Sequence, residues 1–256
     1  MLNNPVIPRP IVSREEWLAA RRALLAKEKE ATRLRDRVNA ERLALPWVKV
    51  EKNYVFDTPQ GKKSLAELFD GRSQLIVYHF MFGPDWAAGC PGCSFLADHI
   101  DGALPHLEHH DVTMIAVSRA PLPKIAAYKR RMGWRFPWVS AFGNDFNYDY
   151  HVSFTRDALA SGKVFYNFSE TEPGDGGNDE LPGLSAFYRD AAGDIFHTYS
   201  SFARGYEMID STYMLLDMTP KGRNETTNLA EWVRRHDEYD DRKRTHTRGG
   251  AGNVRR

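Results

Sequence analysis

The chain of 256 residues has only two cysteines, Cys90 and Cys93, which excludes a scaffold held by several disulfide bonds. It also lacks an excess of either charge, because 35 Lys and Arg residues stand against 34 Asp and Glu residues. The resulting net charge of +1 gives no overall field that would attract nucleic acid or an anionic lipid surface. We therefore expect neither of these partners.

Long apolar runs are missing as well. A membrane-spanning helix needs ~20 apolar residues, whereas the longest apolar run here, LIVYHFMF at 75–82, is short and includes His79. The first residues, MLNNPVIPRP, contain no apolar signal-peptide core. The chain also lacks a P-loop, a GxGxxG fingerprint and a serine nucleophile elbow. These absences predict a cytoplasmic protein without those nucleotide-binding or hydrolase motifs.

The chain does contain alternating strand and helix patterns. The capping box SREE at 13–16 begins a charged helix predicted over 14–43. Helices are also expected near 64–69, 90–107, 122–132, 206–218 and 227–239, and strands near 54–57, 75–82, 111–120 and 135–143, with a hairpin over 184–200 and irregular chain over 144–182. This order predicts the α/β class with a mixed central sheet.

Three regions follow from this pattern. Residues 1–46 are predicted to be a helical extension, 47–223 the main domain, and 224–256 a C-terminal helix with a disordered basic tail. The extension is expected to be a long, mostly solvated helix lying across the domain. Its alternative role is a dimerisation arm, which would make the protein a homo-oligomer.

The two cysteines lie where the buried strand at 75–82 gives way to a helix. A helix N-terminus favours the thiolate, so Cys90 is predicted to have a lowered pKa and to attack. Cys93, one turn further on, could then resolve a mixed disulfide on Cys90. Pro91 suits the first helical position, and Gly92 leaves the approach to Cys90 open.

Three neighbouring side chains are candidates to support this chemistry. Trp86 is expected to form a flat apolar wall near the thiols. Asp85 and His79 are possible proton acceptors for Cys93, although structural or solvent-facing roles are the alternative for both.

A buried strand, a tryptophan and then a Cys-x-x-Cys pair that begins a helix resemble the thioredoxin superfamily. FMFGPDWAAGCPGCSFLAD, FYRDAAGDIFHTYSSFARG and LDMTPKGR are similar to a bacterial family of thioredoxin-like proteins of unassigned function. The resemblance extends from about Val48 to Arg223 and includes the pattern W-x3-C-P-G-C. It implies a three-layer α/β/α sandwich with helices on both sides of the sheet, with Cys90 attacking and Cys93 resolving.

The chain departs from thioredoxin in two places. The proline that thioredoxins place before a late strand is displaced here, because Pro182 is slightly too early for a strand starting at Ser185. Residues 87–89 also lengthen the spacing from Trp86 to Cys90. The segment YVFDTPQGKKSLAELF resembles the lead-in segment of peroxiredoxin-like relatives, so reduction of peroxides is an alternative activity.

Zinc binding by the two cysteines is an alternative to thiol redox chemistry, and it belongs to a different class of function. Cys90, Cys93, His106 and His110 fit the spacing C-x2-C-x12-H-x3-H. A zinc finger, however, needs an unbroken helix around its histidines, and Pro105 lies directly before His106. This alternative makes the protein a non-enzymatic zinc-binding or partner-binding module.

The preferred hypothesis is therefore a dithiol–disulfide oxidoreductase that needs no cofactor in its site. Its expected partners are a disulfide or peroxide substrate and an external thiol reductant. His197 and Arg204, which follow the late hairpin, are weaker candidates for substrate binding, with ordinary strand-end residues as the alternative.

Overall fold

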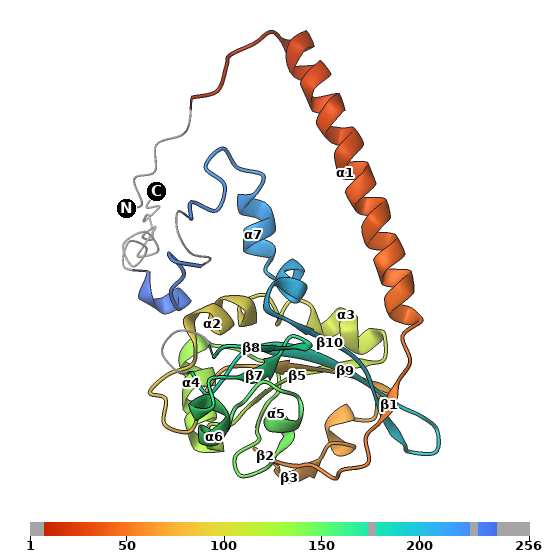
Figure 1. The fold of residues 1–256 in the computed structure, drawn as a ribbon, viewed down its shortest axis with the longest axis vertical. Coiled ribbons are helices and arrows are strands. Elements are labelled where there is room, and N and C mark those ends of the chain that lie inside the picture. Colours follow the sequence, from red (N-terminus) through yellow and green to blue (C-terminus); the bar gives the residue numbers. More distant parts are fainter. Residues whose placement is uncertain (1–7, 174–177, 226–229, 240–256) are drawn as a thin grey trace, which may run out of the picture.

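The computed structural model describes residues 8–173, 178–225 and 230–239. Its main feature is an eight-stranded sheet with the order β1-β10-β9-β4-β5-β6-β2-β3 (Figure 1). The strands of this sheet are β1 (Val48–Lys49), β2 (Val55–Thr58), β3 (Gly61–Ser64), β4 (Gln74–His79), β5 (Val112–Ser118), β6 (Trp138–Ser140), β9 (Gly183–Arg189) and β10 (Ile195–Phe202). A separate hairpin pairs β7 (Val164–Tyr166) with β8 (Ser169–Thr171).

The helical elements surround this sheet. They are α1 (Arg14–Leu43), η1 (Glu67–Phe69), α2 (Pro91–Ala97), α3 (Leu104–His109), α4 (Leu122–Met132), α5 (Phe146–Asp149), α6 (Arg156–Ala160), η2 (Ala203–Ile209), α7 (Ser211–Leu216) and η3 (His236–Glu238), where η marks a 3-10 helix. Side chains of α2 and α4 join the apolar core on one face of the sheet, and those of η1 and α5 join the core on the other.

The central strands are parallel where helices connect them and antiparallel at the late hairpin. β4 runs parallel to β5, and β5 runs parallel to β6, whereas β9 is antiparallel to both β4 and β10. Apolar side chains on alternate positions of β4 enter opposite cores, so this strand is buried on both faces. The predicted thioredoxin-like α/β/α sandwich with a mixed central sheet is therefore confirmed.

The N-terminal helix α1 is confirmed over its predicted length, including the capping box between Ser13 and Glu16. It has no buried residue, and Figure 1 shows it projecting from the domain, which corrects the expectation that it lies across the domain. Near its C-terminal end, the Arg42 guanidinium lies 4.7 Å from the centre of the Tyr199 ring. Association of α1 with a second copy stays a prediction.

Several predicted helices are interrupted or absent. The helix expected over 90–107, with a kink or break at Gly102 and Pro105, is two short helices, because the chain turns between Asp98 and Ala103. The helix expected over 206–218 divides at Asp210 into η2 and α7. The described part of 227–239 has no α-helix, only the 3-10 turn η3, and 144–182 contains short helices and the β7–β8 hairpin instead of irregular chain alone.

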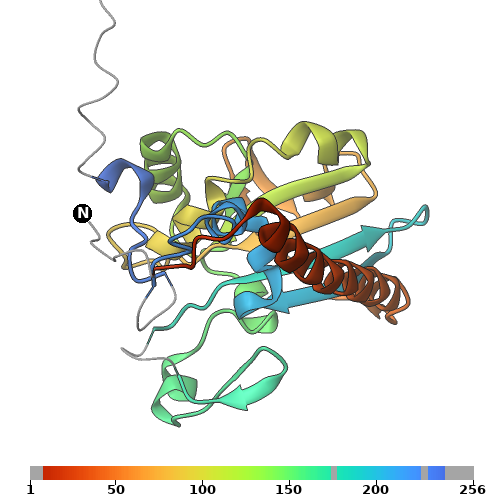
Figure 2. The ribbon, with the colours of Figure 1, turned by 90° about the horizontal axis from the view of Figure 1, so that it is seen from above.

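The late segments lie over one end of the sheet, and Figure 2 shows α7 near α2 when the molecule is seen from above.

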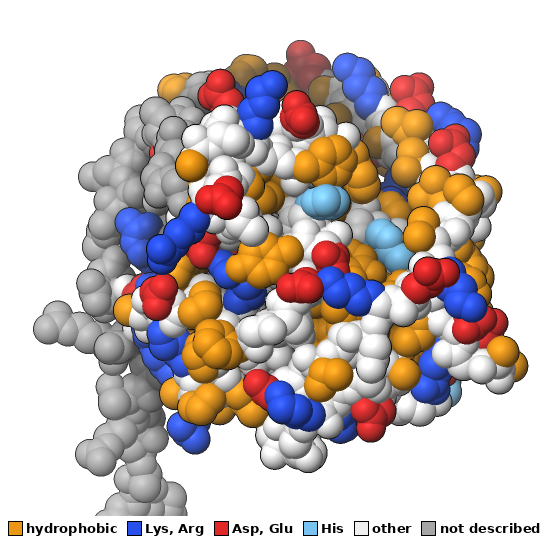
Figure 3. Space-filling view, turned by 60° about the horizontal axis from the view of Figure 1, so that its bottom comes forward, with side chains coloured by type: hydrophobic (Ala, Val, Ile, Leu, Met, Phe, Trp, Pro, Cys, Tyr) orange, Lys and Arg blue, Asp and Glu red, His pale blue; other side chains and the backbone are white. Residues whose placement is uncertain are grey.

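In the part of the chain that the structure describes, no helix has the length and apolar character needed to cross a membrane. Figure 3 shows acidic and basic side chains interspersed over one face, as the balanced composition predicts. The expected basic tail at 240–256 lies outside the described residues, and the three domain boundaries stay predictions.

Candidate functional site

The two thiols lie beyond the C-terminal end of β4, beside the end of β5. The chain after β4 stays attached to β5, because the Phe80 N–H donates to the Val117 carbonyl (3.0 Å) and the Ala120 N–H donates to the Phe82 carbonyl (2.8 Å). A loop then leads to Cys90, which is the N-cap residue of α2. Pro91 occupies the start of the helix, where a missing N–H costs no helical hydrogen bond.

One peptide group contacts both cysteines. The Met81 carbonyl accepts a hydrogen bond from the Cys90 N–H at 3.1 Å, and the Met81 N–H donates toward the Cys93 sulfur. Cys90 is half-buried, whereas Cys93 is 3% exposed, and neither forms a disulfide bond in this structure. The pair is therefore fixed by the backbone at the end of β4, with only the first thiol partly open to solvent.

The pKa of Cys90 is lowered to about 7, chiefly because the Cys93 thiol donates a hydrogen bond to the Cys90 sulfur. Burial acts in the opposite direction, while the backbone N–H groups of Cys93 and Gly92 and the positive charge of Arg235 lower the pKa further. α2 has only seven residues, so these nearby N–H groups, more than the dipole of a long helix, favour the thiolate.

Cys93 has the opposite character. Burial raises the pKa of its thiol well above the ordinary value, and the hydrogen bond to Cys90 and the charge on Cys90 add to this rise. The Tyr78 hydroxyl, which projects from β4 on the same side, acts in the other direction by hydrogen bonding to the Cys93 sulfur. At neutral pH the pair therefore combines a partly ionised outer thiol with a protonated inner thiol.

A cavity of about 190 Å³ adjoins both thiols. Pro182, Tyr206 and Asp210 are among the residues that line it, together with side chains of α2 and α7. Phe95 of α2 packs with Tyr213 of α7 and with Val233, so the late segments form one side of this cavity. Access to the thiols is therefore through a small, largely apolar space.

Asp210 is the most unusual polar group in this cavity, and the sequence analysis missed it. Its Oδ1 atom is buried and has no hydrogen-bond partner among the described residues. Burial, together with the nearby charge of Glu207, raises the pKa of the Asp210 carboxyl to about 7. The sequence IDST did carry a signal, because Asp, Ser and Thr favour helix N-caps and predict the break between η2 and α7.

The structure corrects the expectation that Pro182 is too early to be the proline directly before the late strand. β9 begins at Gly183, not at Ser185, and Pro182 directly precedes it and lines the thiol cavity. The Pro182 carbonyl accepts a hydrogen bond from the Tyr166 hydroxyl at 2.7 Å. The extra strand residues therefore place this proline beside the cysteines.

A second residue that the sequence analysis missed is Arg235, from the C-terminal segment. Its guanidinium donates to the Gly89 carbonyl (2.6 and 3.0 Å) and to the Tyr128 hydroxyl (3.0 Å). Gly89 allows this close packing, because a Cβ atom there would lie 2.6 Å from the Phe80 ring and 2.8 Å from the Tyr128 ring. Arg235 thus holds the residue before Cys90 and places a positive charge near the thiol.

Two of the predicted supporting residues lie away from the thiol cavity. The Trp86 indole covers Gly83, where a Cβ atom would approach it to 2.9 Å, and Trp86 is not among the residues lining the cavity. Asp85 is exposed on the loop and does not line the cavity either. Trp86 packs against the same apolar cluster as Cys90, so its role as a wall near the thiols stays a prediction, and the geometry gives no support to Asp85 as a proton acceptor.

His79 lies on the opposite face of the sheet, because side chains alternate along β4. Its Nδ1 lies 3.1 Å from the Asn147 Oδ1, so Nδ1 carries the proton, and its Nε2 accepts from the Ser185 hydroxyl at 2.9 Å. Burial lowers the pKa of His79 to about 4. His79 is therefore a neutral, hydrogen-bonded core residue, which corrects its prediction as a proton acceptor for Cys93.

The two weaker candidates for substrate binding both line a cavity of about 690 Å³ along β10, but they differ in their relation to the thiols. His197 belongs to the His79 side, because its Nε2 lies 2.7 Å from the Ser200 hydroxyl, which in turn lies 2.8 Å from that of Ser185. Arg204, in contrast, is among the residues that line the thiol cavity, and its guanidinium pairs with Glu207 at 3.0 Å. Only Arg204 is therefore placed to meet a molecule that approaches the cysteines.

The zinc alternative is not supported. Among the residues that the structure describes, no three or more His, Cys, Asp or Glu side chains are grouped so as to hold a metal ion. His106 and His110 lie at α3 and its C-terminal cap, beyond the turn that ends α2. The spacing C-x2-C-x12-H-x3-H is thus fulfilled in sequence without forming a metal site.

A mixed sheet with a Cys-x-x-Cys pair between a buried parallel strand and the next helix defines a thioredoxin-like protein. The chain belongs to the family described as bacterial protein of unknown function (DUF899), whose model matches residues 7–239. A search of curated proteins finds no match.

Some solved structures are similar to this chain. A cysteine-to-serine mutant of peroxiredoxin Q from Xanthomonas campestris is 13% identical, with 64% of this chain and 89% of that chain covered and a TM-score of 0.40. The peroxidoxin BcpB of Mycobacterium tuberculosis is 14% identical, with 65% and 94% covered and a TM-score of 0.38. A yeast mitochondrial 1-Cys peroxiredoxin is 18% identical, with 68% and 78% covered and a TM-score of 0.37.

Proposed function

We propose that this protein is a thiol–disulfide oxidoreductase in which Cys90 attacks and Cys93 resolves. The observation that carries the proposal is the asymmetry of the pair: a half-buried thiol with a pKa lowered to about 7 beside a buried thiol with a raised pKa. An attacking thiol works best when its pKa is close to the ambient pH. Cys90 has this property, and Cys93 does not.

The reaction transfers two electrons from the dithiol to the substrate. The Cys90 thiolate attacks one sulfur of a substrate disulfide, forms a mixed disulfide and releases the other sulfur as a thiolate. Cys93 then loses its proton and attacks the Cys90 sulfur, which releases the second substrate thiolate and leaves a Cys90–Cys93 disulfide. An external thiol reductant returns both cysteines to the reduced form.

We assign Asp210 as the group that accepts the proton of the Cys93 thiol. The carboxyl lines the same cavity as both thiols, and its Oδ1 is free of other hydrogen bonds among the described residues. A carboxyl with a pKa of about 7 can both take up and return a proton near neutral pH. Asp210 thus takes the role for which His79 and Asp85 were the sequence-based candidates.

Peroxide reduction is the second candidate, and the size of the cavity favours it. A space of about 190 Å³ bounded by η2 and α7 admits a small peroxide more readily than a disulfide on the surface of a folded protein. The Cys90 thiolate would attack the peroxide, forming a sulfenic acid and releasing an alcohol or water. Cys93 would then condense with the sulfenic acid, forming the same disulfide and releasing water.

Matched substrates and variants test both candidates. The reduced protein is mixed with a small peptide disulfide or with an organic hydroperoxide, and formation of the Cys90–Cys93 disulfide is followed by mass spectrometry. We expect Cys90→Ser to abolish reaction with either substrate. Cys93→Ser should stop after one step, with a trapped mixed disulfide or a sulfenic acid on Cys90.

The two candidate functions predict different relative rates at which the Cys90–Cys93 disulfide forms in the unmodified protein. Faster reaction with the peptide disulfide supports the first candidate, and faster reaction with the hydroperoxide supports the second. If Cys90→Ser reacts at the rate of the unmodified protein with both substrates, the proposed thiol chemistry is wrong.

A further inference from the structure

A second cavity lies where the central sheet is incomplete. β6 pairs with β5 only from Ala116 to Ser118, so the first half of β5 has no strand beside it on that side within the described residues. β2 in turn pairs with β6 at a single position, Asp57 opposite Ser140. The sheet therefore opens between β5 and the β2–β3 hairpin, at the end of β5 that is remote from the cysteines.

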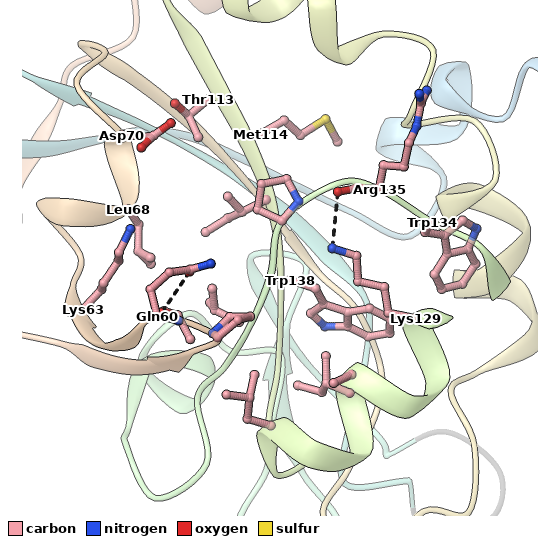
Figure 4. A pocket seen from close by; sticks show the side chains of 18 of the residues that line it. Gln60, Lys63, Leu68, Asp70, Thr113, Met114, Lys129, Trp134, Arg135 and Trp138 are labelled. Carbon is pink, nitrogen blue, oxygen red and sulfur yellow. Dashed lines mark hydrogen bonds between the residues drawn. The ribbon is translucent and has the colours of Figure 1, made fainter. Parts of the chain in front are cut away.

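This opening is a cavity of about 730 Å³, within the range of roughly 300–1,000 Å³ that is usual for small-molecule sites. Leu68 from η1, Met114 from the unpaired half of β5 and Trp138 from the start of β6 give it an apolar lining. α4 closes one side (Figure 4). No residue that lines this cavity also lines the thiol cavity, so the two are separate.

Two lysines lie on opposite sides of the opening. Lys63 comes from β3 and Lys129 from α4, and Figure 4 shows the two on either side of the space. In the described parts of the chain, neither ammonium group lies within 4.0 Å of a carboxylate. Lys49, Lys52 and Lys62, in contrast, each form an ion pair with an aspartate. Among the described residues, the Lys129 ammonium donates a single hydrogen bond, to the Arg135 carbonyl at 3.2 Å.

The acidic side chains at the rim are engaged elsewhere. The Glu67 carboxylate accepts hydrogen bonds from the N–H and the hydroxyl of Ser64, both at 2.7 Å. Asp70 pairs with Arg72 at 3.4 Å, and Glu108 pairs with the same guanidinium at 3.8 Å. The cavity thus combines an apolar lining with three positive charges, on Lys63, Lys129 and Arg130, that form no ion pair within the described residues.

We propose that this cavity binds a small organic anion with a flat apolar body. The body lies against Leu68, Met114 and Trp138, and the anionic group, a carboxylate, sulfonate or phosphate, lies between Lys63 and Lys129. Burial of the apolar part supplies most of the affinity, and the two lysines select for negative charge. This inference is independent of the thiol chemistry, because the two sites share no residue.

Two fluorescent probes test the proposal on the full chain. Anilinonaphthalene sulfonate has a flat apolar body and one anionic group, and phenylnaphthylamine is its uncharged counterpart. We expect the sulfonate to bind at least about tenfold more tightly, which corresponds to one charge-assisted hydrogen bond of about 1.5 kcal/mol. The double variant Lys63→Ala, Lys129→Ala should lose this preference and bind both probes equally.

Adjacent residues provide matched controls. Lys62 precedes Lys63 on β3 but pairs with Asp57 at 2.9 Å and does not line the cavity, so Lys62→Ala should keep the preference for the sulfonate. Ala126 and Ala127 are both exposed on α4, and only Ala126 lines the cavity. Ala126→Trp should therefore block binding of both probes, and Ala127→Trp should not.

The thermal unfolding midpoint of each variant confirms that the chain is folded. If Ala126→Trp and Ala127→Trp bind the probes equally well, the cavity is not the binding site and the proposal is overturned. Equal binding of the charged and uncharged probes by the unmodified protein overturns the anion preference. Neither result depends on the reactivity of Cys90.

Discussion

The two faces of the sheet differ at the end of β4. On one face, a continuous chain of hydrogen bonds joins His79, Ser185, Ser200 and His197. The other ring nitrogen of His79 is hydrogen-bonded to Asn147. On the other face, Tyr78 adjoins two thiols and a cavity that is also lined by Asp210, whose Oδ1 has no hydrogen-bond partner in the described part of the chain.

This difference shows how neighbouring residues of one strand come to have different roles. A buried polar group that is fully hydrogen-bonded contributes to stability and has no lone pair left for chemistry. A buried polar group without a partner costs stability and remains available to a substrate or a proton. We therefore assign the His79 face to stability and the Cys90 face to reactivity, and four predictions test this division.

The largest effect is expected from the ion pair between Arg119 and Glu180. Arg119 follows β5, and Val117, two residues earlier, belongs to the core on the His79 face. Glu180 is 1% exposed, and Arg119→Leu would leave its carboxylate buried without its cationic partner. We expect a loss of about 3–5 kcal/mol in the free energy of unfolding, measured by urea denaturation.

The matched control is the double variant Arg119→Leu, Glu180→Leu, which removes both charges and should recover part of this loss. The titration of Cys90 should be unchanged in either variant. A single variant as stable as the unmodified protein would show that the pair does not stabilise this face.

Asp210→Asn is expected to slow the attack of Cys93 by about 100-fold, because it removes the proton acceptor. The rate should be measured on a preformed mixed disulfide at Cys90, where Cys90 itself no longer titrates. In the unmodified protein this rate should rise with pH through about 7, the pKa to which burial raises Asp210, and the variant should lack this rise. Glu207→Gln alters a carboxyl that is already paired with Arg223, so it should keep this rise. The midpoint of the rise should move to lower pH, because the charge of Glu207 helps to raise the pKa of Asp210.

The same variant has a consequence for stability. Because the folded-state pKa of Asp210 is raised, the stability present below the unfolded pKa is lost as the pH rises through about 7. Asp210→Asn should therefore raise the thermal unfolding midpoint above pH 7. An unchanged rate of Cys93 attack would exclude Asp210 as the proton acceptor.

Cys93→Ala should raise the pKa of Cys90 from about 7 toward the ordinary thiol value of about 9, because it removes the largest cause of the lowered pKa. Cys93→Ser keeps a hydrogen-bond donor and should raise it less. Thiolate ultraviolet absorbance against pH measures both midpoints. Equal midpoints for the two variants would mean that the Cys93 hydrogen bond does not set the pKa of Cys90.

The smallest effect is expected from Ser185→Ala. It removes the hydroxyl that donates to His79 and leaves a buried ring nitrogen unpaired, at a cost of about 1–3 kcal/mol in the free energy of unfolding. The thiolate titration of Cys90 should not move, because the hydroxyl lies on the other face. A shifted Cys90 midpoint would show that the two faces are coupled.

Local sequence was enough to predict much of the fold. The apolar run at 75–82, the Pro91 helix start and the alternation of strands and helices correctly indicated a thioredoxin-like sheet with the cysteines at a strand–helix junction. The closeness of His79 to the cysteines in sequence did not predict on which face of β4 its side chain lies, because a one-residue step along a strand reverses the face. For the same reason Tyr78, not His79, adjoins Cys93.

The sequence by itself determined the thiol pair and its place at the start of a helix, because these depend on residues within one turn of each other. Only the tertiary structure decided which groups meet the thiols. Pro182, Asp210 and Arg235 come from segments about 90 or more positions further along the chain, and no local pattern places them beside Cys90. Their positions follow from the pairing of β9 with β4 and from the packing of α7 and the C-terminal segment on α2.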